Sequence, residues 1–305
     1  TARLSRRSSI WNNSFLVMRR TGNGNSQRER RIKMALDVST AFIKQFESEV
    51  HMAYQRQGTK LRSTVRNKMV TNAKSTTFQK AGEGTATTKS RHAEVAIMNV
   101  THSNVECTLA DYFASDYSDV LDELKTNIDE RQVLALSGAW ALGRKTDELI
   151  TTVLDTTSNT VALAASGMTK AKAFSAFETL GNNDVPDDGR RYGVVGIKQW
   201  TELLDITEFS SSDYVGSDIP LARGLVGKTW LGINWFPFSG LPVDGSSDRK
   251  CFVYHSSGVG FASGKDINTQ IDYIPEKVSH LIMSCMSQGS VMIDDESVVE
   301  VLCDE

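Results

Sequence analysis

The feature that most constrains the fold is a polar ribbon at residues 55–92, rich in Thr, Lys, Arg, Gly and Ser. Its few large apolar side chains are Leu61, Val65, Met69, Val70 and Phe78. The Thr and Val content and the turn at Gly82-Glu83-Gly84 favour a long, exposed β-hairpin. Such a segment has too little apolar surface to fold against its own body. The ribbon therefore needs a partner, either a nucleic acid or the acidic surface of another protein.

Charge is distributed unevenly along the chain. Between residues 56 and 91, nine Lys or Arg face a single acid, Glu83, whereas residues 116–148 hold eight acids and four bases. An acidic body with a basic ribbon can pair with copies of itself, because opposite charges set the register of association. The contact residues predicted on this basis are Arg56, Lys60, Arg62, Arg66, Lys68, Lys74 and Lys80 on the ribbon, and Asp122, Glu123, Asp129 and Glu130 on the body.

Residues 1–33 lack any hydrophobic period and contribute +8 to a net charge of −3, which leaves −11 for residues 34–305. From Met34 the chain reads as an ordinary protein start. The run at 27–33 can be encoded by purine-rich codons, as a ribosome-binding site is. We expect residues 1–33 to be a basic leader that the native protein lacks; the alternative is an arm that contacts DNA. The intact mass of the natural protein distinguishes the two.

Hydrophobic periodicity predicts a chain of the α+β class. Helices are expected at residues 39–54, 117–124, 129–154, 170–180 and 199–204. Strands are expected at residues 93–100, 105–109, 192–197, 229–238, 250–255, 291–293 and 298–303. In the longest helix Leu142, Leu149 and Val153 form an apolar stripe. Gly138 and Gly143 leave its middle slim enough for another element to approach the backbone.

Motifs that could carry chemistry occur outside the setting that each requires. Residues 222–229 fit a relaxed phosphate-loop pattern that ends at Lys228 and Thr229. No buried strand precedes them and a β-patterned segment follows, so no helix N-terminus is available to hold a phosphate. The glycine-rich residues 258–264 are expected to form a bend between strands. The histidines stand alone and no GxSxG elbow occurs, so we expect no catalytic site, metal or cofactor.

The composition also bears on the compartment. The four cysteines form no CxxC pair, and we expect reduced thiols in a chain made in the cytoplasm. No apolar run is long enough to span a bilayer, and no signal-peptide pattern is present. Neither secretion nor a membrane partner is expected.

The order of these elements, together with several local stretches, matches a known family. The stretches lie at residues 46–50, 54–58, 78–84, 121–124, 129–131, 143–147, 220–224, 232–235, 273 onward and 288–292. Taken in this order over residues 34–305, the chain resembles the major capsid protein of tailed bacteriophages with the Hong Kong ninety-seven fold, in particular its short-tailed-phage branch. Some members of that family crosslink a loop lysine to a neighbour's asparagine; Lys68, Lys74 and Lys80 are eligible here.

This resemblance implies a role for each part of the chain. The expected parts are the N-terminal arm and helix (34–57), the extension loop over the neighbouring subunit (58–92), the peripheral domain with its spine helix (93–167 and 288–305) and the axial domain (168–287). The implied function is self-assembly, without catalysis, into the hexamers and pentamers of an icosahedral head around double-stranded DNA. The implied partners are other copies, scaffolding protein, portal, DNA held without sequence specificity, and a decoration protein. Assembly is expected in the bacterial cytoplasm, and the mature location is the virion.

Two other classes of protein remain open at this point. A nucleic-acid-binding protein would use the basic ribbon at 56–91, although Phe78 is its only aromatic residue for base stacking. An encapsulin-like cargo shell would share the same fold. A nucleotide hydrolase is a more distant alternative, which ATP turnover by the protein and by Lys228→Ala would test.

Overall fold

The computed structural model describes residues 55–121, 129–161, 166–210, 225 and 227–305. The leader at 1–33, the helix predicted at 39–54 and two predicted contact residues, Asp122 and Glu123, lie outside these ranges. Within them, none of the helices is long and apolar enough to cross a membrane.

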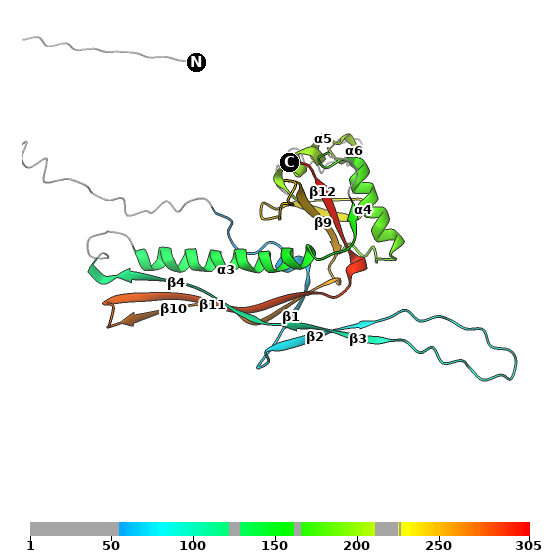
Figure 1. The fold of residues 1–305 in the computed structure, drawn as a ribbon, viewed down its shortest axis with the longest axis horizontal. Coiled ribbons are helices and arrows are strands. Elements are labelled where there is room, and N and C mark those ends of the chain that lie inside the picture. Colours follow the sequence, from blue (N-terminus) through cyan, green and yellow to red (C-terminus); the bar gives the residue numbers. More distant parts are fainter. Residues whose placement is uncertain (1–54, 122–128, 162–165, 211–224, 226) are drawn as a thin grey trace, which may run out of the picture. The chain divides into compact units, whose positions relative to one another are not determined.

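Four strands and the longest helix form one layered unit (Figure 1). The strands, in sheet order, are β1 (Arg66–Met69), β10 (Val259–Ile274), β11 (Ser279–Met292) and β4 (Ala110–Asp119). Only the pair β1 and β10 is parallel among them. Helix α3 (Glu130–Leu154) packs on one face, where Ser290 Oγ donates to the Leu149 carbonyl at 2.7 Å and Gly138 leaves room for Ser284. The predicted helix 129–154 is confirmed, with Asp129 as its N-cap.

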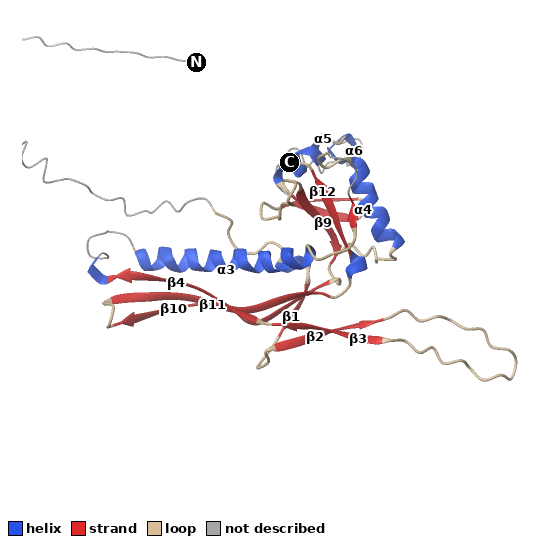
Figure 2. Ribbon diagram, viewed as in Figure 1, coloured by secondary structure: helices blue, strands red, loops and turns tan. Residues whose placement is uncertain are grey.

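A six-stranded mixed sheet with three helices around it forms the other part (Figure 2). Its strands, in sheet order, are β5 (Thr160–Val161), β12 (Val298–Cys303), β9 (Arg249–His255), β6 (Arg191–Val195), β8 (Ile233–Pro237) and β7 (Lys228–Trp230). The helices are α4 (Lys170–Asn182), α5 (Ile197–Asp205) and α6 (Thr207–Ser210). Trp200, Trp235, Phe252 and Tyr254 are fully buried in its core. Burial of such large side chains is the main source of its stability.

The exposed hairpin is present, with different limits from those predicted. Strands β2 (Ser75–Ala81) and β3 (His102–Thr108) pair antiparallel, and residues 82–101 link them (Figure 1). The strand predicted at 93–100 is wrong, because this segment is extended and exposed but has no partner strand. The residues opposite it include Gly82 and Gly84, and glycine weakens strand pairing. Before the hairpin, η1 (Arg62–Thr64) and β1 belong to the body.

Other local predictions are corrected by long-range pairing. Residues 117–119 were expected in a helix but complete β4, where Tyr117 pairs with Leu281. The single strand predicted at 229–238 is the hairpin of β7 and β8, whose turn has positive φ at Leu231 and Gly232. The bend predicted at 258–264 is only partly present. Gly258 lies in the turn between β9 and β10, whereas residues 259–264 belong to β10, whose register shifts between Ser263 and Lys265.

The buried stripe of α3 also differs from the predicted one. Leu142, Ile150 and Leu154 are buried, whereas Leu149 and Val153 are only half-buried. The helix is rotated because polar Thr146 and Asp147 on the buried face serve other parts of the chain.

The two sheets divide the chain differently from the predicted domain boundary at residue 288. Strands β10 and β11 join the sheet under α3, whereas β12 joins the six-stranded sheet. Residues 259–274 and 279–292 therefore share a sheet with β4. The short turn η2 (Asp295–Ser297) is where the chain passes from one sheet to the other.

Replacing Gly289 by alanine tests how the hairpin root is held. A Cβ at this position would collide with the Thr108 carbonyl oxygen of β3. We expect Gly289→Ala to lower the free energy of unfolding by about 1–3 kcal/mol, the usual cost of overpacking. Gly245→Ala is the matched control, because no atom lies within 4 Å of its Cβ position. Urea unfolding of the unassembled subunit measures both, and equal losses would contradict the close packing.

Candidate intersubunit surfaces

A buried aspartate fixes residues 55–61 to the C-terminal half of α3. The Asp147 carboxylate is fully buried, and its Oδ1 accepts the backbone N–H groups of Lys60 and Leu61, each at 3.1 Å. Arg56 Nε lies 3.7 Å from the second oxygen. Burial raises the pKa of Asp147, and the Leu61 hydrogen bond and the Arg56 charge oppose that rise. The carboxylate therefore anchors the chain immediately ahead of η1.

Two glycines allow the same segment to lie directly on the helix. Gly58 has a φ of +66°, and its backbone lies 3.1–3.2 Å from the place where a Gly143 Cβ would stand. Arg144 Nη1 donates to Gln55 Oε1 at 2.7 Å, next to this contact. The close approach predicted for the slim middle of the helix is confirmed, and at Gly143 the approaching element is the chain's own N-terminal segment.

The predicted ribbon cations are divided between the body and the hairpin. Three form ion pairs within the chain: Arg56 with Asp147 at 3.7 Å, Arg62 with Asp266 at 2.6 Å and Lys80 with Asp294 at 2.8 Å. A fourth, Lys68, donates to the Thr77 carbonyl at 2.9 Å. Lys60, Arg66 and Lys74 have no ion pair with any described residue. Much of the ribbon's charge is therefore matched by its own body.

The predicted acids that the structure describes lie where α3 begins. Asp129 caps the helix, and Glu130 Oε2 accepts the Ser118 hydroxyl at 3.1 Å. Asp116 and Asp119 on β4 lie at the same end of the sheet. No ribbon cation reaches Asp129 or Glu130 among the residues with described positions. A contact of the ribbon cations with Asp129 or Glu130 therefore requires a second copy.

Sequence reasoning missed an apolar surface on the sheet face away from α3. Phe113 and Tyr117 of β4 are 65% and 45% exposed, and they pair across to β11, where Leu281 and Met283 are half-buried. Together these four residues form what we call the open sheet face. The signal that could have found it was the alternation of residues 110–119, which was partly read as a helix.

The tip of the hairpin is also apolar. Val95 is 71% exposed and Ile97 is 91% exposed, two positions apart in the link between β2 and β3. Their alternation was visible in the sequence and was interpreted as a strand. In the structure it forms an apolar stripe that the subunit itself leaves uncovered.

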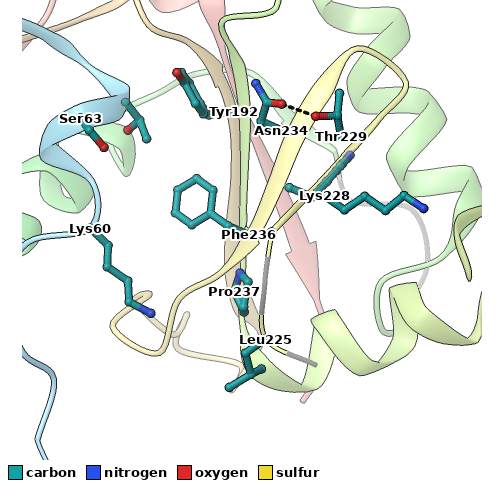
Figure 3. Close-up of a pocket in the computed structure, with 12 residues that line it drawn as sticks. Lys60, Ser63, Tyr192, Leu225, Lys228, Thr229, Asn234, Phe236 and Pro237 are labelled. Atoms are coloured by element: carbon teal, nitrogen blue, oxygen red, sulfur yellow. Dashed lines mark hydrogen bonds between the residues drawn. The ribbon is translucent and has the colours of Figure 1, made fainter. Parts of the chain in front are cut away.

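Residues 60–66 border two adjoining hollows. One has a volume of about 500 Å³, and Figure 3 shows Lys60 and Ser63 across it from Phe236 and Pro237 of β8. The other has a volume of about 410 Å³ and shares Ser63 and Tyr192 with the first. Six polar residues that line these hollows are called the basic groove here: Lys60, Ser63, Arg66, Arg190, Tyr192 and Ser256. Thr64, Lys228, Thr229, Asn234 and Ser257 also line the hollows. No Asp or Glu of the described chain lines either hollow.

Lys228 and Thr229, which end the phosphate-loop pattern in the sequence, make hydrogen bonds within the fold. Lys228 belongs to strand β7, and its Nζ donates to the Phe209 carbonyl at 3.0 Å, away from Lys60 (Figure 3). Thr229 Oγ1 donates to Asn234 Oδ1 at 2.5 Å. Lys228 and Thr229 thus lie in a strand where a phosphate-binding helix should begin, and residues 222–224 and 226 of the motif lie outside the described ranges.

The remaining titratable groups have structural partners. His255 Nε2 lies 2.9 Å from Asp188 Oδ1, and its Nδ1 lies 2.7 Å from the Ser257 hydroxyl in the adjacent turn. The hydrogen bond from His255 lowers the pKa of Asp188. All four cysteines are buried and unpaired. Among the described residues, no group of His, Cys, Asp or Glu is arranged to hold a metal ion.

Comparison with known proteins identifies the family of the chain. The model of the phage capsid protein family matches residues 38–305. The chain belongs to this family. Among solved structures, the capsid of cyanophage P-SCSP1u is 18% identical, with a TM-score of 0.71 over 87% of this chain and 94% of that one. The head of Helicobacter pylori bacteriophage KHP40 is 13% identical, with a TM-score of 0.74 over 87% and 96%. No curated protein sequence matches significantly.

The capsid protein thus has the α+β fold of the Hong Kong ninety-seven type that its sequence resembles. It is a structural subunit of a phage shell in the virion, and the shell is built from copies of this subunit. The alternatives of a nucleic-acid-binding protein and a cargo shell are not supported.

Proposed function

We propose that the capsid protein forms hexamers and pentamers of an icosahedral head around double-stranded DNA, with the hairpin of β2 and β3 laid over a neighbouring subunit. The observation that carries this proposal is the uncovered hairpin: residues 82–101 make no strand pair, and Val95 and Ile97 expose most of their surface. Exposed apolar surface of this kind marks an interaction site.

The domain roles follow the sheets. In this proposal α3 and the four-stranded sheet form the peripheral domain with its spine helix, and the six-stranded sheet with α4, α5 and α6 forms the axial domain at the capsomer centre. Residues 34–57 act as the N-terminal arm. The extension loop runs over residues 75–108, later than the 58–92 implied by the resemblance, because β1 is occupied by the body sheet.

Fewer ribbon cations are available for a charged contact with a neighbouring subunit than the sequence implied. Lys74 lies at the root of the hairpin without an ion pair among the described residues, and we assign it the acids near the start of a neighbour's α3, namely Asp122, Glu123, Asp129 and Glu130. Lys80 of β2 is engaged by Asp294 of its own chain. Arg56 and Arg62 are engaged by Asp147 and Asp266 of the same chain. These two arginines fix the hairpin root, and the exposed cations contribute mainly register.

The other partners belong to the same proposal. Scaffolding protein and portal take part in assembly in the host cytoplasm, and a decoration protein is a further partner of the finished head. DNA is enclosed without sequence specificity, and no enzymatic step is required of the subunit. The charge of −11 over residues 34–305 supports a wall that does not grip packaged DNA.

Assembly is tested directly by expressing residues 34–305, alone and with the neighbouring genes. Sedimentation and negative-stain microscopy should show closed shells or capsomer rings. A monodisperse monomer under every condition, scaffold included, would overturn the proposal.

Ile97→Asp tests the apolar contact of the hairpin. Covering a large apolar side chain contributes about 1.5–3 kcal/mol, so its loss should raise the concentration needed for assembly at least tenfold, since about 1.4 kcal/mol is a factor of ten. Light scattering against protein concentration measures the threshold. Thr87→Asp, which adds the same charge to a polar exposed position of the same loop, is the control. Equal thresholds for the two variants would contradict an apolar contact at Ile97.

A further inference from the structure

The basic groove holds donors that its own chain does not use. Lys60 and Arg66 have no ion pair within the described residues, and the hydroxyls of Ser63, Tyr192 and Ser256 make no hydrogen bond there. The remaining cation, Arg190, has its Nε 3.9 Å from Asp188 Oδ2. Both of those side chains are largely exposed, and such a pair contributes little. Among the described residues, the groove cations therefore have only weak internal contacts: Arg190 has its exposed pair with Asp188, Arg66 stands 5.7 Å from the centre of the Phe78 ring, and Lys60 has no ion pair.

Regular structure fixes the positions of these donors. Arg66 is the first residue of β1, Arg190 directly precedes β6, and Ser256 directly follows β9. The Ser256 N–H donates to the Arg190 carbonyl at 3.1 Å, which holds the two sides of the site together. A site built on strand ends is preorganised for a ligand. Guanidinium groups match planar or tetrahedral oxyanions, with two parallel N–H donors each.

The volume of the groove and the chemistry of the shell select the occupant. Hollows of about 410 and 500 Å³ accommodate a few side chains of an extended segment. A DNA duplex is far too wide to enter them. In a closed shell each subunit is surrounded by copies of itself, and residues 34–305 of every copy have an excess of 11 acids over bases.

We propose that the basic groove binds an acidic segment of a second copy of this chain, whose carboxylates lie between Lys60, Arg66 and Arg190. This inference rests on the proposed shell function and adds a contact separate from the hairpin. It keeps the intersubunit contact that the sequence predicted for Lys60 and Arg66, places both residues outside the hairpin, and adds Arg190. They form a socket at the base of the hairpin, and the neighbour supplies the acid.

Substitutions in the full chain give the first test. Arg66→Gln and Arg190→Gln should each raise the assembly threshold of shells about tenfold at low salt, and the double variant should raise it further. Thermal unfolding of the subunit should change little, because the guanidinium of Arg66 contacts only the Phe78 ring, at 5.7 Å, and that of Arg190 only the exposed Asp188. Salt should weaken assembly of the wild type more than that of the double variant. Lys198→Gln, which removes an exposed cation from α5 outside the groove, should behave as wild type.

Zero-length carbodiimide coupling gives the second test. This reagent joins the Lys60 amine to a carboxylate in contact as an amide, with net loss of water. Shells assembled from mixed ¹⁴N and ¹⁵N protein should yield Lys60–Asp or Lys60–Glu peptides with mixed labels, which proves that two copies are joined. Monomers should yield none, and Lys60→Gln should abolish the product.

The outcomes separate this inference from the function on which it rests. Failure of the wild type to form any shell removes both. Shells that form normally in the Arg66→Gln/Arg190→Gln variant, without mixed-label Lys60 peptides from the wild type, overturn the groove contact alone. If the groove cations are protected from chemical modification only in DNA-filled shells, the occupant is nucleic acid and the assignment to a second copy is wrong.

Discussion

Asp147→Ala is expected to lower the free energy of unfolding of the capsid protein by about 3–5 kcal/mol, the usual cost of breaking a buried charged contact by removing one partner. The variant leaves the N–H groups of Lys60 and Leu61 without an acceptor in a buried site, and it leaves Arg56 without its counter-charge. Urea unfolding of the unassembled subunit measures the loss. A loss below about 1 kcal/mol would show that the carboxylate does not hold residues 55–61.

Asp147→Asn is the matched control. Its amide oxygen can still accept both N–H groups, so only the charge contact with Arg56 is lost and the destabilisation should be clearly smaller. The pH dependence should also change. Burial raises the pKa of Asp147 above its ordinary value of 3.8, so in the window just above 3.8 the folded state binds more protons than the unfolded state. Wild-type stability should therefore fall as the pH rises through that window, and Asp147→Asn should lack this contribution.

Shortening the hairpin is expected to abolish shell formation while the subunit stays folded. Residues 83–100 can be replaced by Asn-Gly, the preferred two-residue hairpin turn, because Gly82 N already donates to the Thr101 carbonyl at 2.8 Å. The removed residues are almost entirely exposed, so the free energy of unfolding should change by no more than about 0.5 kcal/mol. Sedimentation should then show capsomers or monomers in place of shells.

The double variant Thr87→Ser/Thr88→Ser keeps the full length of the loop. It controls for the effect of altering the loop sequence, and it should assemble normally. Shells of the shortened protein that form at the wild-type threshold would show that the hairpin is dispensable. In that event the basic groove and the open sheet face would become the main candidates for the contact between subunits.

Elements whose causes are local could be predicted from the sequence. Helix α3 follows from its periodicity and its Asp129 cap, and β12 was predicted at its observed limits because Val298 to Cys303 is continuously apolar apart from Glu300. Strand β11 was almost entirely missed. Its apolar alternation is interrupted by Ser284 and Gln288, which are fully buried.

The partners that make these polar residues tolerable lie far away in sequence. Gln288 accepts the Thr146 hydroxyl at 2.6 Å across 142 positions, and Ser284 occupies the space left by Gly138. The candidate surfaces show the same limit. Asp266 and Asp294 each lie more than 200 positions from the ribbon cations that they neutralise. The run of basic residues in the sequence therefore overstated the positive charge that is left for contact with a neighbouring subunit.

Residues 55–61 are attached to helix α3, whereas β1, which leads into the hairpin, is attached to the sheet. Asp147 of α3 holds Lys60 and Leu61, β10 holds β1 from Arg66 onward, and only residues 62–65 lie between the two anchors. Fully extended, these few residues span about 3.5 Å each, and η1 already uses part of that length in a tight turn. The four linking residues therefore allow little movement of the helix relative to the sheet. If α3 slides over its sheet by a few ångströms, η1 must unwind and the Arg62–Asp266 ion pair must lengthen. This turn is therefore the place where a shift between helix and sheet is first felt as a change of backbone conformation.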